Sequence, residues 1–239
     1  MFKPVFALLA ALLLAAPGHA SVIIGATRVI YPAGAPEVTV QLLNPDAAPA
    51  LVQAWLDDGD AGANPQTLAV PFIVSPAMVR IEASQGQALR VMHTGEPLAA
   101  DRESLFWLNV LQIPSRGEVG NNQLQMAIRT RIKLMFRPQG LTGRAADAPA
   151  AVRWSVHREQ QQWVVEGHNP GPFVVNLGAV DLHSAGQVRE AGGGHIPPFG
   201  SARFPLQGAA VPGAAAQVNY IALDDYGAGR PGEAQVVLP

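Results

Sequence analysis

Apolar and polar residues alternate along most of this chain. The clearest run is "NNQLQMAIRTRIKLMFRP", from Asn121 to Pro138, in which every even position from Leu124 to Phe136 is apolar or threonine. Alternation with a period of two indicates a β-strand that presents different residues on its two faces. Strands are usually about 5–6 residues long. The run therefore predicts an overlong strand and raises the question of what each face does.

Shorter β patterns lie on both sides of this run, separated by Pro, Gly, Asn and Asp. Those before it are "SVIIGATRVIYP", "EVTVQLLNP", "ALVQAWLDD", "FIVSPAMVRIEA", "QALRVMH" and "SLFWLNVLQIP". Those after it are "AVRWSVHR", "QWVVEGHNP", "PFVVNLGAVDL", "SARFPL", "QVNYIALDDY" and "EAQVVLP". Regular short strands between turn residues predict β-sandwiches. The proline within "FIVSPAMVRIEA" predicts a bend or an edge there. Amphipathic helical periods are nearly absent.

A segment rich in Gly, Ala and Pro, from Pro138 to Ala150, separates the two sets of strands and has no periodicity. We interpret it as a linker, because domain boundaries fall in segments of this composition. The expected organisation is a first β-sandwich over residues 21–140 and a second over 141–239. Two Gly- and Ala-rich stretches of the second set, Glu190–Gly194 and Gln207–Ala216, are interpreted as loops.

The first twenty residues, "MFKPVFALLAALLLAAPGHA", predict the compartment. A lysine precedes an apolar run from Val5 to Ala16, which is shorter than the ~20 residues of a membrane span. Gly18 and Ala20 suit a cleavage site, so residues 1–20 are expected to be a signal peptide cut after Ala20. An uncleaved N-terminal anchor is the alternative. No second long apolar run follows, so we expect an exported protein without membrane insertion.

Composition narrows the function further. With 49% hydrophobic and 14% charged residues the chain can form a sizeable core, and its formal net charge of −2 does not favour a nucleic-acid partner. The chain has no cysteine. Thiol nucleophiles, thiolate metal sites and disulfides are therefore excluded, and the exported domains must rely on their cores.

Motifs for catalysis or cofactor binding are weak. "GAGRPG", Gly227–Gly232, matches a dinucleotide fingerprint, but it contains a proline and no helix is expected after it. Asp224 and Asp225 form an acidic pair, but neighbours in a strand point to opposite faces. They are therefore a poor candidate for catalysis by paired carboxylates. The histidines of the mature chain show no ligand spacing; they are His93, His157, His168, His183 and His195. The sequence predicts no catalytic residue, no metal, no cofactor and no enzyme activity.

Several stretches together resemble the periplasmic pilus-assembly chaperones of the chaperone–usher pathway. They are "ATRVIYP", "VQAWL", "DRESLFWLNVLQIP", "RIKLMFRP", "NPGPFVVNL" and "DDYGAGRP", in the order of the family and over nearly the whole mature chain. The resemblance implies an all-β fold of two immunoglobulin-like β-sandwich domains set at an angle with a cleft between them. It implies a chaperone that lends a strand to pilin subunits, by donor-strand complementation, and delivers them to an outer-membrane usher.

The resemblance also implies roles for individual residues. Leu124, Met126 and Ile128 match the side chains that fill the groove of the pilin; the alternative is that they face this protein's own core. Arg28 and Lys133 match the anchor for the C-terminal carboxylate of the pilin, or they are ordinary surface cations. Lys133 lies on the odd positions, opposite the groove-filling residues. Either twist or a bulge in the strand turns Lys133 toward the cleft, or the two faces of the strand have different tasks.

Further positions match family features. Glu103, Arg137 and Asp225 match an ion network between the domains, and otherwise would be unrelated surface charges. Pro49 matches a proline that gates usher engagement, although a plain turn proline fits "NPDAAPA" equally well. Ser75-Pro76 matches a cis peptide. The short connection between "LQIP" and "QLQM" resembles the branch with a short loop before the last strand of the first domain.

Two other classes of function stay open at this point. An exported immunoglobulin-like adhesin or carbohydrate-binding module would need exposed aromatic residues, and only 6% of the residues are aromatic. A periplasmic hydrolase has no supporting motif. A self-capping dimer of the chaperone is also left open, because an exposed strand edge invites pairing.

Overall fold

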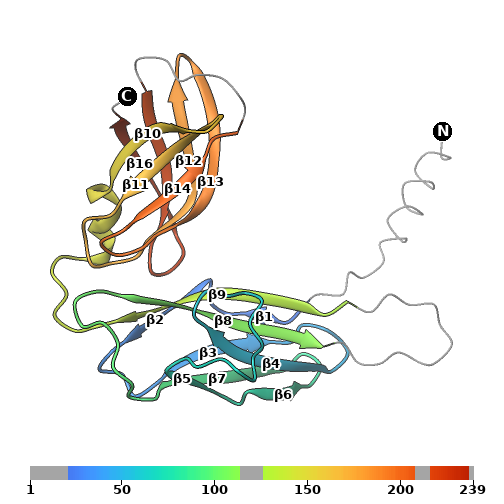
Figure 1. The fold of residues 1–239 in the computed structure, drawn as a ribbon. Coiled ribbons are helices and arrows are strands. Elements are labelled where there is room, and N and C mark those ends of the chain that lie inside the picture. The colour runs from blue at the N-terminus through green and yellow to red at the C-terminus, as the bar shows by residue number, and fades with distance from the viewer. Residues whose placement is uncertain (1–20, 114–125, 208–215, 237–239) are drawn as a thin grey trace, which may run out of the picture.

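The computed structural model describes residues 21–113, 126–207 and 216–236, and nearly all of its regular structure is β (Figure 1). The first domain is a sandwich of two sheets. One sheet, in spatial order, contains β1 (Ile23–Ile24), β3 (Val38–Leu43), β7 (Gly86–His93) and β5 (Phe72–Ser75). The other contains β2 (Arg28–Pro32), β9 (Ile128–Arg137), β8 (Ser104–Ile113), β4 (Ala50–Asp57) and β6 (Met78–Ile81).

Two segments of the first domain pass from one sheet to the other. The opening stretch, which the alternation predicts as one strand, is two: β1 pairs with β3, and β2 pairs with β9 in the second sheet. The predicted bend in "FIVSPAMVRIEA" is confirmed, because β5 and β6 pair in different sheets. The Ser75-Pro76 peptide between them is cis, as the resemblance implies.

The second domain is also a two-sheet sandwich. Its smaller sheet contains β10 (Arg153–Glu159), β11 (Gln162–His168) and β14 (Ser201–Pro205). Its larger sheet contains β13 (Gln187–Ile196), β12 (Val175–Ser184), β15 (Ala216–Leu223) and β16 (Gly229–Val236). Figure 1 shows the two domains as separate lobes with their long axes at a steep angle.

The Gly-rich stretch Glu190–Gly194 is not a loop, as its composition suggests, but the middle of strand β13. The backbones of β12 and β13 approach closely there, at an irregularity in their register. A Cβ atom on Gly193 would lie 2.6 Å from the carbonyl oxygen of Gly178, and Gly192 has a φ of +85°. Glycine is therefore required by the close approach, and the missing side chains hide the strand alternation from the sequence.

The linker is more ordered than its composition indicates. Residues Ala145–Ala151 form a 3-10 helix, η1, whose Ala148 packs into the core of the second domain. The Tyr220 hydroxyl donates a hydrogen bond of 3.1 Å to the carbonyl oxygen of Pro149. The motif "GAGRPG" does not form a single loop, because its last four residues belong to β16.

Each domain has its own hydrophobic core. Tyr31, Leu89 and Leu134 are among the fully buried residues of the first core, and Val165 and Leu182 of the second. The predicted all-β architecture of two sandwiches is confirmed. Within the described ranges, no helix has the length and apolar character needed to cross a membrane.

Candidate binding site along strand β9

Strand β9 has two different surroundings along its length. On one side it pairs with β8 throughout, from Ile128 opposite Gln112 to Phe136 opposite Ser104. On the other side the parallel strand β2 pairs only with the stretch from Lys133 to Arg137. Among the described residues, no strand pairs with Ile128–Ile132 on that side. This stretch therefore has a free edge, with backbone groups available to another strand.

The even positions of β9 form the core face, and this face continues beyond the core. Ile132, Leu134 and Phe136 are buried, with Leu134 at 0% exposure. Ile128 is on the same face, because side chains alternate and the pairing with β8 has no register shift, yet it is 41% exposed. Met126, just before the strand, is 65% exposed. Leu124, the third residue expected to fill a groove, lies outside the described residues.

The odd positions of β9 from Lys133 to Arg137 face the second domain. The Lys133 ammonium donates to the Asn176 side-chain oxygen at 2.8 Å and to the Gly194 carbonyl at 3.2 Å, on β12 and β13. Arg28 is opposite Lys133 in the β2–β9 pairing. Its Nη1 donates to the Leu223 carbonyl at 3.2 Å. With no bulge in β9, the two faces of one regular strand carry the two sets of predicted site residues.

The Arg28–Lys133 pair lacks a direct anionic partner in the described structure. The acceptors of these hydrogen bonds are neutral carbonyl and amide oxygens, and Nε of Arg28 is buried without a hydrogen-bond partner. Burial, with the nearby Arg28 charge, lowers the pKa of Lys133 to about 8. Burial also lowers the pKa of Arg28, against the attraction of Asp224 and Asp225. An added anion would stabilise the charged forms of both side chains, because it would compensate for the hydration that they lose on burial.

Aromatic rings flank this pair. Trp107 is opposite Lys133 on β8, and its ring meets that of His195 on β13 edge-on, with the centroids 5.8 Å apart. Burial, followed by repulsion from Lys133, lowers the pKa of His195 to about 4. The imidazole is therefore neutral at neutral pH and adds no third positive charge. Sequence spacing could not identify His195 or Asn176, because both reach Lys133 only through the docking of the domains.

The structure brings Glu103, Arg137 and Asp225 together at the same junction. Nε of Arg137 donates to Glu103 at 2.6 Å, and its Nη1 and Nη2 donate to the two carboxylate oxygens of Asp225 at 2.8 and 2.9 Å. The Val174 amide also donates to Glu103 at 2.7 Å. Glu103 is 3% exposed, and burial raises its pKa against the attraction of Arg137.

The neighbouring residues Asp224 and Asp225 have separate tasks, and neither lies in a strand. Asp224 accepts hydrogen bonds from the amides of Tyr226 and Ala228, and so closes the turn between β15 and β16. Asp225 pairs with Arg137 of the first domain. Gly227 of this turn, at a φ of +87°, lies against Thr27, next to Arg28. The turn therefore joins the second domain to the start of β2.

The odd face of the free-edge stretch carries a polar network that the sequence did not indicate. Asp57, at 0% exposure, pairs with Arg131 and accepts a hydrogen bond of 2.7 Å from Asn109. Nε of Arg129 donates to the Asn109 oxygen at 2.8 Å. The guanidinium groups of Arg131 and Arg129 lie over the rings of Trp107 and Trp55, respectively. These contacts hold the odd-position side chains against the protein's own sheet.

Pro49 lies at the other end of this sheet. It is half-buried and immediately precedes β4, where Leu51 is opposite Ile113, the last residue of β8. The Asn44 side chain donates to the Ala48 carbonyl at 2.9 Å and so shapes the loop that ends at Pro49. Pro49 is therefore close to the Ile128 end of the sheet and far from the domain junction.

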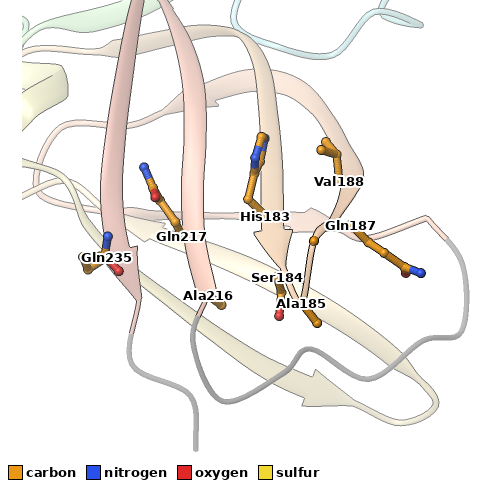
Figure 2. Close-up of a pocket in the computed structure, with 9 residues that line it drawn as sticks. His183, Ser184, Ala185, Gln187, Val188, Ala216, Gln217 and Gln235 are labelled. Atoms are coloured by element: carbon orange, nitrogen blue, oxygen red, sulfur yellow. The ribbon is translucent and has the colours of Figure 1, made fainter.

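A pocket in the second domain is separate from these residues (Figure 2). His183, Gln187, Val188, Gln217 and Gln235 are among the side chains that line it, at the end of β12 opposite the junction. Its lining has no carboxylate, arginine or lysine. Over the described ranges, no group of three or more His, Asp or Glu residues is placed to hold a metal ion.

Comparison with known proteins places the chain in a family. Residues 21–142 match the pili and flagellar-assembly chaperone family, PapD N-terminal domain, and residues 147–234 match the C-terminal domain of the pili assembly chaperone PapD. The chain belongs to the PapD family of pilus-assembly chaperones. The predicted immunoglobulin-like folds and the resemblance are thereby confirmed, and the adhesin alternative is not favoured. This family is not known as a family of enzymes.

Relatives and solved structures agree. The chain is 41% identical to the chaperone protein FimB/FhaD of Bordetella pertussis, over 93% of this chain and 91% of that protein. It is 37% identical to the probable fimbrial chaperone YadV of Escherichia coli, over 91% and 90%. The crystal structure of the YadV chaperone superposes with a TM-score of 0.78 at 35% identity, covering 90% of this chain and 100% of that one.

One similar structure contains a partner. It is the Salmonella enterica SafA pilin in complex with the SafB chaperone, with a TM-score of 0.75 and 31% identity over 92% of this chain and 98% of that one. The branch with a short loop depends on residues 114–125, outside the described ranges, and stays a prediction.

Proposed function

We propose that this protein is a periplasmic chaperone that lends the free edge of β9 to pilin subunits and delivers them to an outer-membrane usher. The observation that carries the proposal is the continuity of two features along one strand. The unpaired edge at Ile128–Ile132 leads directly to the Arg28–Lys133 pair. A partner strand supplies main-chain hydrogen bonds at such an edge, and side chains at alternate positions supply specificity.

The direction of the bound strand follows from the geometry. Strand β2 runs parallel to β9 and begins at Arg28, opposite Lys133. A strand that extends the position of β2 along Ile128–Ile132, and also runs parallel to β9, ends at these two cations. A C-terminal carboxylate there would meet two half-buried cations and accept charge-assisted hydrogen bonds. An antiparallel strand would place its amino terminus there, where like charge repels it.

The groove-filling role belongs to Met126 and Ile128, together with Leu124. The exposed Ile128 continues the core face of β9, so a partner sandwich that lacks a strand could take this face into its own core. Each such side chain would contribute about 1.5–3 kcal/mol on burial. The relative SafB, solved with the pilin SafA, supports a pilin as the partner here.

The remaining assignments complete the proposal. Residues 1–20 act as a signal peptide cleaved after Ala20, residues 21–140 bind the subunit together with 141–239, and the protein has no catalytic activity. Glu103, Arg137 and Asp225 hold the angle between the domains. Pro49 gates usher engagement at the sheet end that carries Ile128. A dimer capped at this edge would be the form without a subunit.

The test is recovery of a pilin co-expressed in the periplasm with Lys133→Ala or Arg28→Ala. Both variants should fold and yet recover little soluble pilin, because the carboxylate anchor is lost. Arg80→Ala is the matched control, since Arg80 pairs with Glu82 on the exposed surface of the same domain. Undiminished pilin recovery by the Lys133 and Arg28 variants would overturn the anchor.

A further inference from the structure

The side chain that orients Lys133 comes from the second domain. Asn176 on β12 is 5% exposed, and its Oδ1 accepts the 2.8 Å hydrogen bond from the Lys133 ammonium. Its Nδ2 lies 3.3 Å from the sulfur of Met135, two residues beyond Lys133 on the same face of β9. The amide therefore spans two neighbouring odd positions of β9, and its oxygen is directed at the ammonium.

The donors of Lys133 are only partly used in the free protein. An ammonium group has three N–H donors. Asn176 and the Gly194 carbonyl account for two within the described residues, which leaves one for a ligand. Gly194 is held beside Asn176 by the β12–β13 pairing, in which Leu177 is opposite Gly194 and Asn176 is opposite His195. Two strands of the second domain thus fix the direction of the third donor.

The neutrality of Asn176 matters as much as its position. A carboxylate at this site would also orient the ammonium, but it would form an ion pair with it and compete with an anionic ligand. An aliphatic side chain would leave the ammonium without its acceptor. A buried amide oxygen is the kind of group that orients a cation and leaves its charge uncompensated.

We propose that Asn176 is a positioning residue for Lys133, which sets the specificity of the site for a free chain-end carboxylate over a neutral chain end. This inference rests on the proposed function, because it requires that Lys133 bind a carboxylate. It assigns to the second domain a direct part in that specificity. The Arg28–Lys133 pair alone would be incomplete without the acceptors on β12 and β13.

The experiment uses the mature chain and two synthetic peptides of alternating threonine and valine, one with a free C-terminal carboxylate and one amidated. Their dissociation constants are measured for the wild type, Asn176→Asp and Asn176→Leu. The wild type should prefer the free carboxylate, and both variants should lose about tenfold of that preference. Gln187→Glu is the matched control, because it adds a negative charge at the far end of the β12–β13 pair.

A second readout separates positioning from a structural role. The Lys133 pKa, followed by NMR of its side chain, starts at about 8. The new carboxylate in Asn176→Asp should raise this pKa, whereas the lost acceptor in Asn176→Leu should lower it further. A structural role alone predicts weaker folding without opposite pKa changes. If Asn176→Asp fails to fold in a thermal melt, Asn176→Leu and its downward pKa change carry the test.

The outcomes distinguish the two proposals. If the wild type binds both peptides equally, the carboxylate anchor of the proposed function fails, and this inference fails with it. If the wild type prefers the carboxylate and both variants keep the full preference and the same Lys133 pKa, only the role of Asn176 is overturned.

Discussion

The two halves of strand β9 have the same alternation but opposite surroundings. From Lys133 to Arg137 the strand lies between β2 and β8, its even face is buried and its odd face meets the second domain. From Ile128 to Ile132 it has β8 on one side only, and Ile128 is exposed. Sequence periodicity is therefore a statement about faces, whereas function depends on which neighbours each face and edge has. Four predictions test this contrast.

The largest effect is expected in the half that joins the domains. Arg137→Ala would leave Glu103, which is 3% exposed, without its cation, and losing one partner of a buried ion pair costs about 3–5 kcal/mol. Urea unfolding would measure this loss of stability. The control is Arg144→Ala, whose pair with Asp147 is exposed and should contribute about 0–1 kcal/mol. Equal losses in the two variants would contradict a buried network.

The next prediction compares two isoleucines on the even face of β9. Ile132→Ala removes a buried side chain and should cost about 2–5 kcal/mol of unfolding free energy. Ile128→Ala removes a side chain that is 41% exposed and should change stability by only about 0.5 kcal/mol. Pilin recovery should show the reverse order, with a larger loss in Ile128→Ala than in Ile132→Ala. A large loss of stability in Ile128→Ala would mean that Ile128 supports the protein's own core.

A smaller effect is expected on the odd face of the free-edge half. Arg131→Ala would leave the buried Asp57 with Asn109, the Gly59 amide and the more distant Arg129, at 3.7 Å, as remaining partners, at a cost of about 1–3 kcal/mol. Burial raises the pKa of Asp57, but the hydrogen bonds outweigh it and hold this pKa below its ordinary value. The difference between wild type and variant should therefore disappear as pH falls through that lowered pKa. A difference that is constant into strong acid would contradict this origin.

The last prediction concerns the pH dependence at Lys133. Its pKa of about 8 lies below the ordinary 10.5, so between these values the unfolded chain holds more protons. The Lys133 contribution to stability should rise with pH in this window, while affinity for a carboxylate peptide falls as the ammonium loses its charge. Urea unfolding and peptide binding between pH 7 and 10 would measure the stability and the affinity, and Lys133→Met would serve as the control variant. Parallel changes in stability and affinity would contradict the assignment.

Much of the fold could be predicted from local patterns. Period-two alternation with turn residues indicated β-strands and two sandwiches, because the pleat places alternate side chains on opposite faces. It failed at Glu190–Gly194, where glycines allow close backbone approach and leave no side chains to alternate. It also joined β1 to β2, since a change of sheet does not interrupt an apolar pattern.

The sequence by itself determined most of the strands, the family resemblance and five candidate site residues, which are Arg28, Lys133, Glu103, Arg137 and Asp225. Tertiary structure alone decided that β9 has a free edge, that its two faces have different neighbours, and that Asn176 contacts Lys133. The last contact joins residues 43 positions apart, in different domains. Local periodicity reports which residues share a face, and only the packing of strands and domains decides what that face meets.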